Sequence, residues 1–179
     1  MAYLNERWFS ANDTLAEAKG HSLGASIRAR HGGGASRPNG GILHPRRTTL
    51  PAGTNLVRFD GSSRPAVARN GKWWLTFAEY KRIQAFADAQ RISIPAAVAE
   101  LCYVPEEWND MHVVIQAVLK QPLYAYTGAG RAAHGRDRHY PERTDGTGHA
   151  IVQVFLPGMH DTNVHDAMAI TGVGFLPGR

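Results

Sequence analysis

The sequence predicts a single α+β domain with a mostly antiparallel, split β-sheet core and two adjacent helices. Short apolar segments bounded by Gly, Pro and Asn turns recur between residues 50 and 175, and they predict several strands. Residues 77–90 have the apolar spacing of a helix, and a second short helical segment follows directly. Because strands and helices do not alternate regularly, a doubly wound parallel sheet is disfavoured. The 179 residues, 43% of them hydrophobic, suffice for one core.

The first 50 residues differ in composition from the rest. Residues 18–59 contain no Asp or Glu, and residues 31–41 read HGGGASRPNGG, which offers little to bury and costs much entropy to order. We therefore expect residues 1–50 to be a basic, Gly-rich extension, with a short helix around 14–19, and residues 51–179 to be the α+β domain. An alternative is that the extension is an arm that binds polyanions.

The domain is expected to open with two strands. Pro51 and Gly53 mark a turn, residues 55–59 follow as a strand, and Asp60-Gly61 ends it. Asn70-Gly71 then turns the chain into a strand at residues 72–76. That strand carries Trp73 and Trp74, which must be covered by the core or by a ligand.

The helices have clear start signals. Thr76 and Glu79 form a capping box, in which the Thr76 hydroxyl accepts from the Glu79 amide. Apolar residues at helical spacing then predict the helix over 77–90. Ser93 caps a second helix over 95–102, with proline tolerated in its first turn.

The rest of the chain is expected to complete the sheet. Residues 111–119 place Val113, Ile115, Ala117 and Leu119 on one face and His112, Val114, Gln116 and Val118 on the other, a pattern that suits a central strand. Residues 123–127 and 150–156 predict two more strands, and 169–175 an edge strand. The charged, Gly-containing segment 131–149 between them is expected to be a long mobile loop.

Composition excludes several classes of protein. Cys102 is the only cysteine, so an intrachain disulfide and a Cys-rich zinc site are excluded, and a buried thiol is favoured over a nucleophile. No apolar stretch approaches the roughly 20 residues of a membrane-spanning helix. The N-terminus lacks the apolar core of a secretory signal. We expect a cytoplasmic protein, or one exported by a signal-peptide-independent route. The net charge of +5 favours polyanionic partners.

Other site motifs fail on spacing. His160 and His165 are five residues apart, about 140° around a helix, so they do not share a face. His134 and His139 match no metal motif either, and no metal site is predicted. The segment 128–130 lacks the third glycine of a dinucleotide-binding loop, and there is no Gly-x-Ser-x-Gly nucleophile motif.

The order of the elements resembles the ADP-ribosyltransferase superfamily, especially small bacterial toxin and effector domains, over residues 50–179. The strand NLVRFD (55–60) carries an arginine, and GKWWLT (71–76) is an aromatic strand that ends in a hydroxyl residue. A helix follows, then the pair 111–127 that ends in PLYAYTG, and finally the strand IVQVF (151–155) with its internal glutamine. The resemblance implies NAD as the ligand.

Four residues correspond to the family's NAD-binding positions. Arg58 matches the arginine that binds the pyrophosphate or nicotinamide ribose, since a guanidinium donates two parallel hydrogen bonds to phosphate. Thr76 matches the polar wall of the nicotinamide pocket, and Trp73 or Trp74 its aromatic floor. The alternatives stay open: Arg58 as a solvated strand residue, Thr76 as only a helix cap, and the tryptophans as core.

Gln153 stands where the family's transferases place a catalytic glutamate. A neutral amide can bond a ribose hydroxyl but cannot balance the positive charge that develops as nicotinamide leaves. Either Gln153 binds NAD without efficient chemistry, or a carboxylate comes from elsewhere, or Gln153 is a buried structural residue. The candidate carboxylates lie in loops: Glu106, Glu107, Glu142 and Asp145.

The leading hypothesis is an NAD-binding domain that transfers ADP-ribose to a macromolecule or hydrolyses NAD, with Arg58 and Gln153 in the catalytic site. The acceptor could be protein or nucleic acid, and an immunity or chaperone protein is an expected partner. Two alternatives remain. One is a nucleic-acid-binding module that grips phosphates with the loop arginines Arg131, Arg136, Arg138 and Arg143. The other is a non-catalytic protein-interaction domain with the tryptophans as its hot spot.

Overall fold

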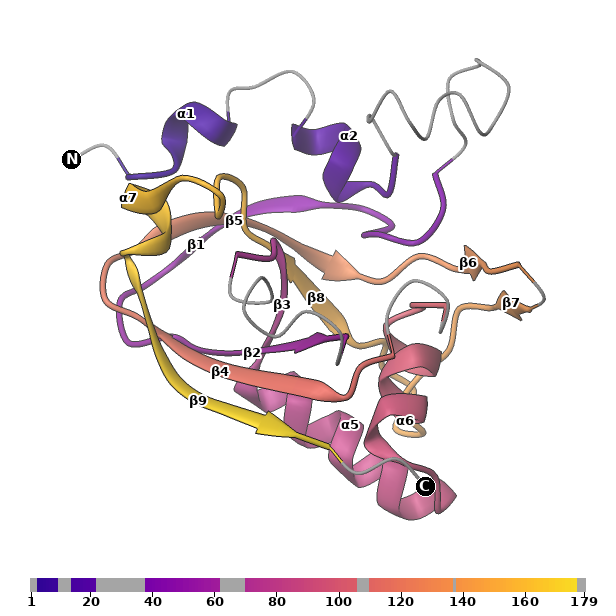
Figure 1. Cartoon of the computed structure of the whole chain (residues 1–179). Helices are drawn as coiled ribbons and strands as arrows, with labels where there is room; N and C mark the ends of the chain where they lie inside the picture. Colours follow the sequence, from indigo (N-terminus) through magenta and orange to yellow (C-terminus); the bar gives the residue numbers. More distant parts are fainter. Residues whose placement is uncertain are drawn as a thin grey trace.

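The protein is an α+β domain built on one seven-stranded antiparallel sheet (Figure 1). The computed structural model describes residues 3–9, 14–21, 38–61, 70–105, 110–136 and 138–176. The described helices are α1 (Glu6–Phe9), α2 (Thr14–Ala18), α5 (Phe77–Gln90), α6 (Ile94–Leu101) and α7 (Thr162–His165). The strands are β1 (Arg46–Leu50), β2 (Asn55–Asp60), β3 (Trp73–Thr76), β4 (Val113–Leu119), β5 (Leu123–Ala129), β6 (Ala133–His134), β7 (His139–Tyr140), β8 (Val152–Phe155) and β9 (Met168–Phe175).

The large sheet has the strand order β1-β5-β8-β3-β2-β4-β9. The strands that carry the predicted site, β2, β3 and β8, are neighbours in its middle. The predicted α+β class with a mostly antiparallel sheet is confirmed, and the last strand, β9, lies at an edge of the sheet as expected. All seven strands belong to one continuous sheet, and β6 and β7 form a separate hairpin.

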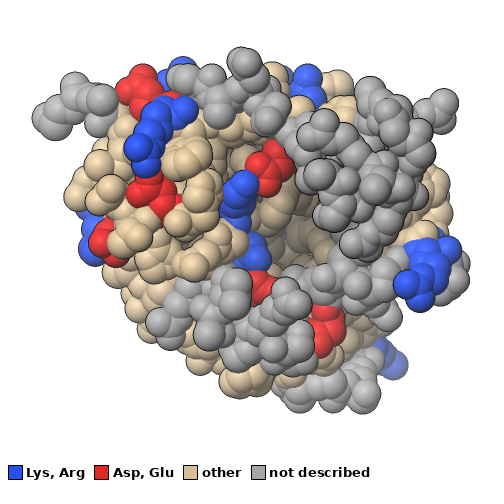
Figure 2. Space-filling view, turned by 45° about the horizontal axis from the view of Figure 1, so that its top comes forward, with Lys and Arg blue, Asp and Glu red and all other residues tan. Residues whose placement is uncertain are grey.

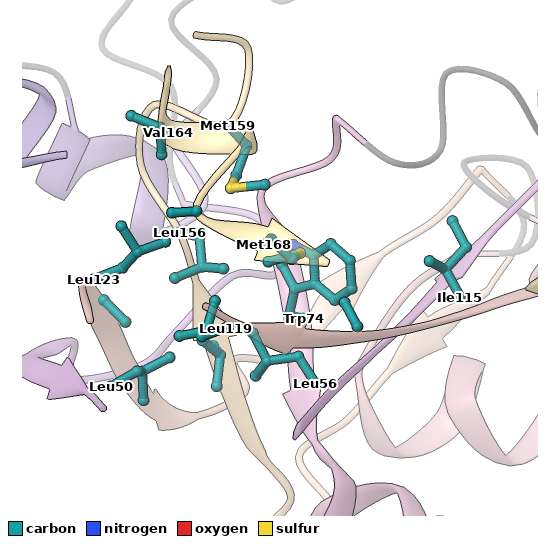
Figure 3. Close-up of a cluster of buried hydrophobic side chains, with 14 of the residues drawn as sticks. Leu50, Leu56, Trp74, Ile115, Leu119, Leu123, Leu156, Met159, Val164 and Met168 are labelled. Atoms are coloured by element: carbon teal, nitrogen blue, oxygen red, sulfur yellow. The ribbon is translucent and has the colours of Figure 1, made fainter. Parts of the chain in front are cut away.

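The sheet is strongly curved, and its inner face carries the main core (Figures 1 and 3). Leu56, Trp74, Ile115 and Val154 come from four different strands of this face and belong to one buried cluster. The segment between β8 and β9 closes one end of the inner face. Figure 3 shows three of its side chains, Leu156, Met159 and Val164, beside the inner-face residues.

The outer face is covered by helices. Val57, Leu75 and Val114 point to this side and are buried under α5 and α6. Farther along the sheet, Tyr126 and Phe155 pack in a separate buried cluster with residues of α1 and α2. Adjacent strand residues alternate between the two faces, so β2, β3, β4, β5 and β8 each contribute to an inner and an outer core.

The N-cap residues of α5 and α6, Thr76 and Ser93, are those predicted. The Thr76 hydroxyl accepts from the Glu79 amide at 3.3 Å, and the helix ends at Gln90 with Arg91 in the left-handed region. Ser93 accepts from the Ala96 amide at 3.3 Å and starts the second helix. The Glu79 carboxylate accepts from the amide of Val152 at 3.0 Å, so the start of α5 is tied to β8.

Sheet pairing reaches to the N-terminal side of the boundary expected at residue 50. The strand β1 pairs with β5 along its whole length. Its sequence, RRTTL, gives no strand pattern because it lies at an edge and buries only Leu50. Asn5, fully buried, donates to the carbonyl of Tyr124 at 2.7 Å and accepts from its amide at 2.9 Å. Residues 31–37 of the Gly-rich stretch lie outside the described residues.

The segment 131–149, expected to be a long mobile loop, contains the β6–β7 hairpin and one side of a partly buried ion pair. Asp145 accepts from Arg82 of α5 at 2.7 Å, and its side chain is 3% exposed. Arg82 also donates to the carbonyl of His149 at 3.0 Å. Tertiary contacts with α5 therefore anchor a segment that has no apolar periodicity of its own.

Among the helices of the described residues, none has the length and apolar character that a membrane-spanning helix needs.

Candidate functional site

Arg58 lies on the inner face of the sheet, where it forms a partly buried ion pair. It shares this face with Leu56, whereas Val57 and Phe59 point to the helix-covered side as predicted. Its Nη2 and Nε atoms donate to Oδ2 of Asp60 at 2.6 and 3.2 Å. Its Nη1 atom donates to the carbonyl of Trp73 at 2.9 Å. The guanidinium is therefore held in one orientation by two neighbouring strands, with 13% of its side chain exposed.

Gly71 makes room for this guanidinium. A β-carbon at Gly71 would lie 1.7 Å from Cζ of Arg58, which no packing can accommodate. The Gly71 carbonyl accepts from the indole of Trp74 at 2.8 Å, and this hydrogen bond holds the glycine backbone in place. The Asn70-Gly71 turn predicted from the sequence thus has a second role, because it provides the surface over which Arg58 lies.

A second ion pair lies next to Gly71 in the sequence. Lys72 donates to both carboxylate oxygens of Glu17 in α2 at 2.8 Å, and both side chains are about one-third exposed. Figure 2 shows basic and acidic residues side by side next to a hollow near the middle of one face. Arg58 and Lys72 each have an acidic partner, Asp60 and Glu17. An anionic ligand must therefore share the cation with that carboxylate or displace the carboxylate.

The two tryptophans point to opposite sides of β3. Trp74 is 2% exposed in the main core, so it can act only as a buried floor. Trp73 is half-buried on the outer face, with its ring 4.8 Å from that of Phe155. Thr76 pairs with Leu56 and so lies on the face of Arg58, and its hydroxyl caps α5.

Gln153 lies on the face opposite to Arg58. It pairs with Leu75, which pairs with Val57, so all three side chains point toward the helices. Gln153 is 7% exposed, and its Nε2 atom donates to the carbonyl of Cys102 at 2.8 Å. The structure therefore brings Arg58, Trp74 and Thr76 to one face and leaves Gln153 and Trp73 on the other. The alternation of Ile151, Gln153 and Phe155 indicated that Gln153 is buried, whereas its side relative to Arg58 follows from the strand register.

The candidate carboxylates do not gather at Arg58. Asp145 is bound to Arg82, whose hydrogen bond is the first cause that holds the pKa of this carboxyl well below its usual range. Glu142 is exposed and accepts from the Ala132 amide at 3.4 Å. Glu106 and Glu107 lie outside the described residues. The carboxylate beside Arg58 is Asp60, which sequence reasoning missed. Its signal was the two-residue spacing, which places both side chains on one face of a strand.

Cys102 is a buried thiol, as expected. Burial, followed by the charge of Glu79, raises its pKa to about 12. A thiol in this state is protonated at neutral pH and is a poor nucleophile.

The loop arginines are largely engaged within the domain. Arg138 and Arg143 both bind Glu100 of α6, at 3.0 and 2.7 Å. Arg131 donates to the carbonyl of Leu43 at 3.2 Å. The rings of His134 and His139 stack on each other in the β6–β7 hairpin, 4.2 Å apart.

Comparison with known proteins finds similarity in structure only. No protein-family model matches the chain, and no curated protein sequence matches it. The chain is similar to Rhs1-CT, solved in complex with its cognate immunity protein RhsI1, with a TM-score of 0.53, 14% identity, and coverage of 95% of this chain and 99% of that one. It is also similar to Tne2, solved in complex with Tni2, with a TM-score of 0.47, 15% identity, and coverage of 76% and 95%. At 14% identity, the likeness to Rhs1-CT is one of fold.

Proposed function

We propose that this chain is an NAD-binding toxin or effector domain of the ADP-ribosyltransferase kind, of bacterial type, which transfers ADP-ribose to a macromolecule or hydrolyses NAD. The observation that carries the proposal is the Arg58 cluster. A guanidinium is held by Asp60 and by the Trp73 carbonyl, over a glycine that leaves it space, on the strand where the resemblance expects it. Such a fixed fork suits the bidentate binding of a pyrophosphate.

In this proposal Arg58 binds the NAD pyrophosphate, and Asp60 keeps the guanidinium in place when NAD is absent. Trp74 supports the site from the core through its bond to Gly71. Thr76 lies on the same face and can contribute the polar wall. Gln153 acts from the opposite face, where it links β8 to α6, and it contributes stability rather than a contact with NAD.

A cognate immunity protein is the partner that we propose. The fold likeness to Rhs1-CT, which was solved with its immunity protein, supports this role. A domain that consumes NAD would harm the cell that makes it, so a protein that binds and neutralises it is needed. The described surface near Arg58 is already partly enclosed by charged pairs, and a bound protein could block access to it.

The structure gives less support to the two alternatives, a nucleic-acid-binding module and a non-catalytic protein-interaction domain. Base stacking on Trp74 or a hot spot built on it is excluded because the ring is buried. Phosphate binding by Arg138 and Arg143 would have to compete with Glu100.

The test is the release of nicotinamide from NAD by the purified chain. The wild type is expected to release it, and Arg58→Ala to release it at least tenfold more slowly. The control Lys120→Ala removes an exposed cation just after the C-terminal end of β4 and is expected to act like the wild type. If the wild type binds no NAD and releases no nicotinamide, with or without macromolecular acceptors, the proposal is wrong.

A further inference from the structure

Lys72 lies beside the guanidinium of Arg58. It stands between Gly71 and Trp73 in the chain, and both of these neighbours meet that guanidinium. A β-carbon at Gly71 would lie 1.7 Å from the Cζ atom of Arg58, and the Trp73 carbonyl accepts from its Nη1 atom at 2.9 Å. Consecutive Cα atoms are about 3.8 Å apart, so the backbone of Lys72 is one step from both groups that frame Arg58.

The strand registers direct Lys72 to the face of the sheet that carries Arg58. The register of β2 with β3, continued past the end of their ladder, sets Lys72 opposite Asp60. On the other side of β3, the Lys72 carbonyl accepts from the amide of Leu156 at 2.7 Å, one residue beyond the last pair of β3 and β8. Leu156 belongs to the inner core. Directly opposed residues of an antiparallel sheet point to the same side, so both registers assign Lys72 to the inner side.

The two carboxylates that accompany these cations are held differently. Oδ2 of Asp60 accepts from Arg58, and its Oδ1 atom accepts from the Gly61 amide at 2.8 Å, so the backbone also fixes this carboxylate. Both oxygens of Glu17 accept from Nζ of Lys72, and 39% of the Glu17 side chain is exposed. A turn of the Glu17 side chain toward water releases Lys72, whereas Asp60 stays with Arg58.

The helix α2 keeps its place when the Glu17 side chain turns away. Ala18, the next residue, is fully buried, and its carbonyl accepts from the Ile42 amide at 2.8 Å. The exchange therefore needs a rotation of one side chain and no release of the helix. Because its backbone stays docked, Glu17 remains a competitor for Lys72 within the same molecule.

A pyrophosphate suits a lysine next to a fixed arginine. The guanidinium offers a planar fork, and the ammonium is a compact charge on a flexible stem that can follow a phosphate oxygen. The Arg58 side chain is 13% exposed and that of Lys72 is 30% exposed, so solvent reaches both. Figure 2 shows basic and acidic groups next to one another at a hollow of the surface.

We propose that Lys72 is a second phosphate-binding residue, which exchanges the Glu17 carboxylate for one phosphate of NAD while Arg58, held by Asp60, binds the other. This assignment rests on the proposed function. It makes Glu17 a built-in competitor that lowers the affinity for the pyrophosphate.

The test is calorimetric titration of NAD and of inorganic pyrophosphate, at one ionic strength, into the wild type and variants of the pair. Lys72→Ala is expected to weaken both ligands about tenfold, the loss expected for one charge-assisted hydrogen bond. Lys72→Arg keeps the charge and should bind within about threefold of the wild type. Lys120→Ala, which removes an exposed cation just after β4, should bind like the wild type.

Glu17→Gln should bind both ligands about threefold more tightly, since a competing carboxylate is lost. Glu6→Gln is the matched control for the change in net charge, because Glu6 is a 46% exposed glutamate of α1 that pairs with Arg47 instead. In the double variant Lys72→Ala/Glu17→Gln the gain should disappear, since Glu17 acts through Lys72. Thermal unfolding of each variant checks that it is folded, and Lys72→Arg keeps the test valid if Lys72→Ala does not fold.

The outcomes separate this inference from the proposed function. If Lys72→Ala binds both ligands like the wild type while Arg58→Ala loses NAD, Lys72 is not a ligand residue and the proposed function stands. The exchange is wrong if Glu17→Gln binds no more tightly than Glu6→Gln, or if its gain persists without Lys72. If the wild type binds pyrophosphate through Lys72 but binds no NAD, the phosphate site stands and the proposed function falls. If it binds neither ligand, both proposals fall.

Discussion

The guanidinium of Arg58 occupies the space in which a side chain at Gly71 would begin. Arg58 comes from β2 and Gly71 from the turn before β3, and the Asp60 carboxylate and the Trp73 carbonyl fix the guanidinium in that place. The geometry of the proposed phosphate site therefore depends on a residue with no side chain.

Gly71→Ala is expected to act like a mutation of Arg58 itself. The new β-carbon must push the guanidinium or the turn aside, which we expect to cost about 1–3 kcal/mol of unfolding free energy. NAD affinity should fall at least tenfold. Gly172→Ala is the control, since its β-carbon would meet its nearest neighbour at 3.8 Å, an ordinary contact. Urea unfolding and NAD titration of both variants measure the effects, and an unperturbed Gly71→Ala would contradict the described packing.

Gln153→Ala is expected to change stability and not NAD affinity. The Cys102 carbonyl would lose its donor within the protein, and a small cavity would form, at a cost of about 2 kcal/mol. Chemical denaturation and NAD titration of the same variant separate the two effects. If the Gln153→Ala protein were as stable as the wild type but no longer bound NAD, Gln153 would be a ligand-binding residue. That result would contradict its placement on the outer face.

The Arg82–Asp145 pair predicts a loss of stability in acid. The pKa of the Asp145 carboxyl is held below its ordinary value of about 3.9, first by the hydrogen bond from Arg82. A carboxyl whose pKa is lower in the folded state stabilises the fold fully above its unfolded pKa, and the contribution is lost as the pH falls below that value. Asp145→Asn should lower stability by about 1 kcal/mol at pH 7, since the pair is partly buried and Arg82 keeps Glu79 as a partner.

The same variant should flatten the decline in stability between pH 5 and pH 2.5. Denaturant unfolding across that range checks this. Asp166→Asn is the matched control, because the Asp166 side chain is 71% exposed. Parallel pH curves for the wild type and Asp145→Asn would show that the Arg82–Asp145 pair does not set the acid sensitivity.

Asn5→Ala should release the N-terminal segment from the sheet. The Asn5 amide bonds both backbone groups of Tyr124 and also the carbonyl of Pro157 at 3.3 Å. We expect a loss of about 2–3 kcal/mol and faster hydrogen exchange in α1 and β5. Exchange measured by mass spectrometry, with Asn55→Ala at an exposed strand position as control, tests this. Unchanged exchange in α1 would show that Asn5 is not the anchor.

Much of the fold could be predicted because local patterns and tertiary structure agree. The helix 77–90 has its N-cap and its apolar face in the sequence itself. The strand β4 was recognisable because its sequence is apolar at every position except Gln116, and its inner face is fully buried. The strand β1 could not be found in the same way, since a polar edge strand is defined by its partner β5 and not by its own composition.

The site was predictable in part, for the same reason. Arg58 was singled out by the resemblance, and its apolar neighbours Val57 and Phe59 predicted the face on which it lies. The separation of Gln153 from Arg58 depends on the register of three strands, and no single strand contains that information. The burial of Asp145 depends on an arginine 63 residues earlier in the chain. Such contacts arise only when the loop is docked on α5.

Titration of NAD into the wild type, Arg58→Ala, Arg58→Lys and Lys120→Ala tests the central claim most directly. We predict measurable binding to the wild type and to Lys120→Ala, at least tenfold weaker binding to Arg58→Ala, and an intermediate affinity for Arg58→Lys, which keeps the charge and loses the planar fork. NAD that binds equally to all four proteins, or to none of them at protein concentrations able to detect millimolar affinity, would contradict the claim.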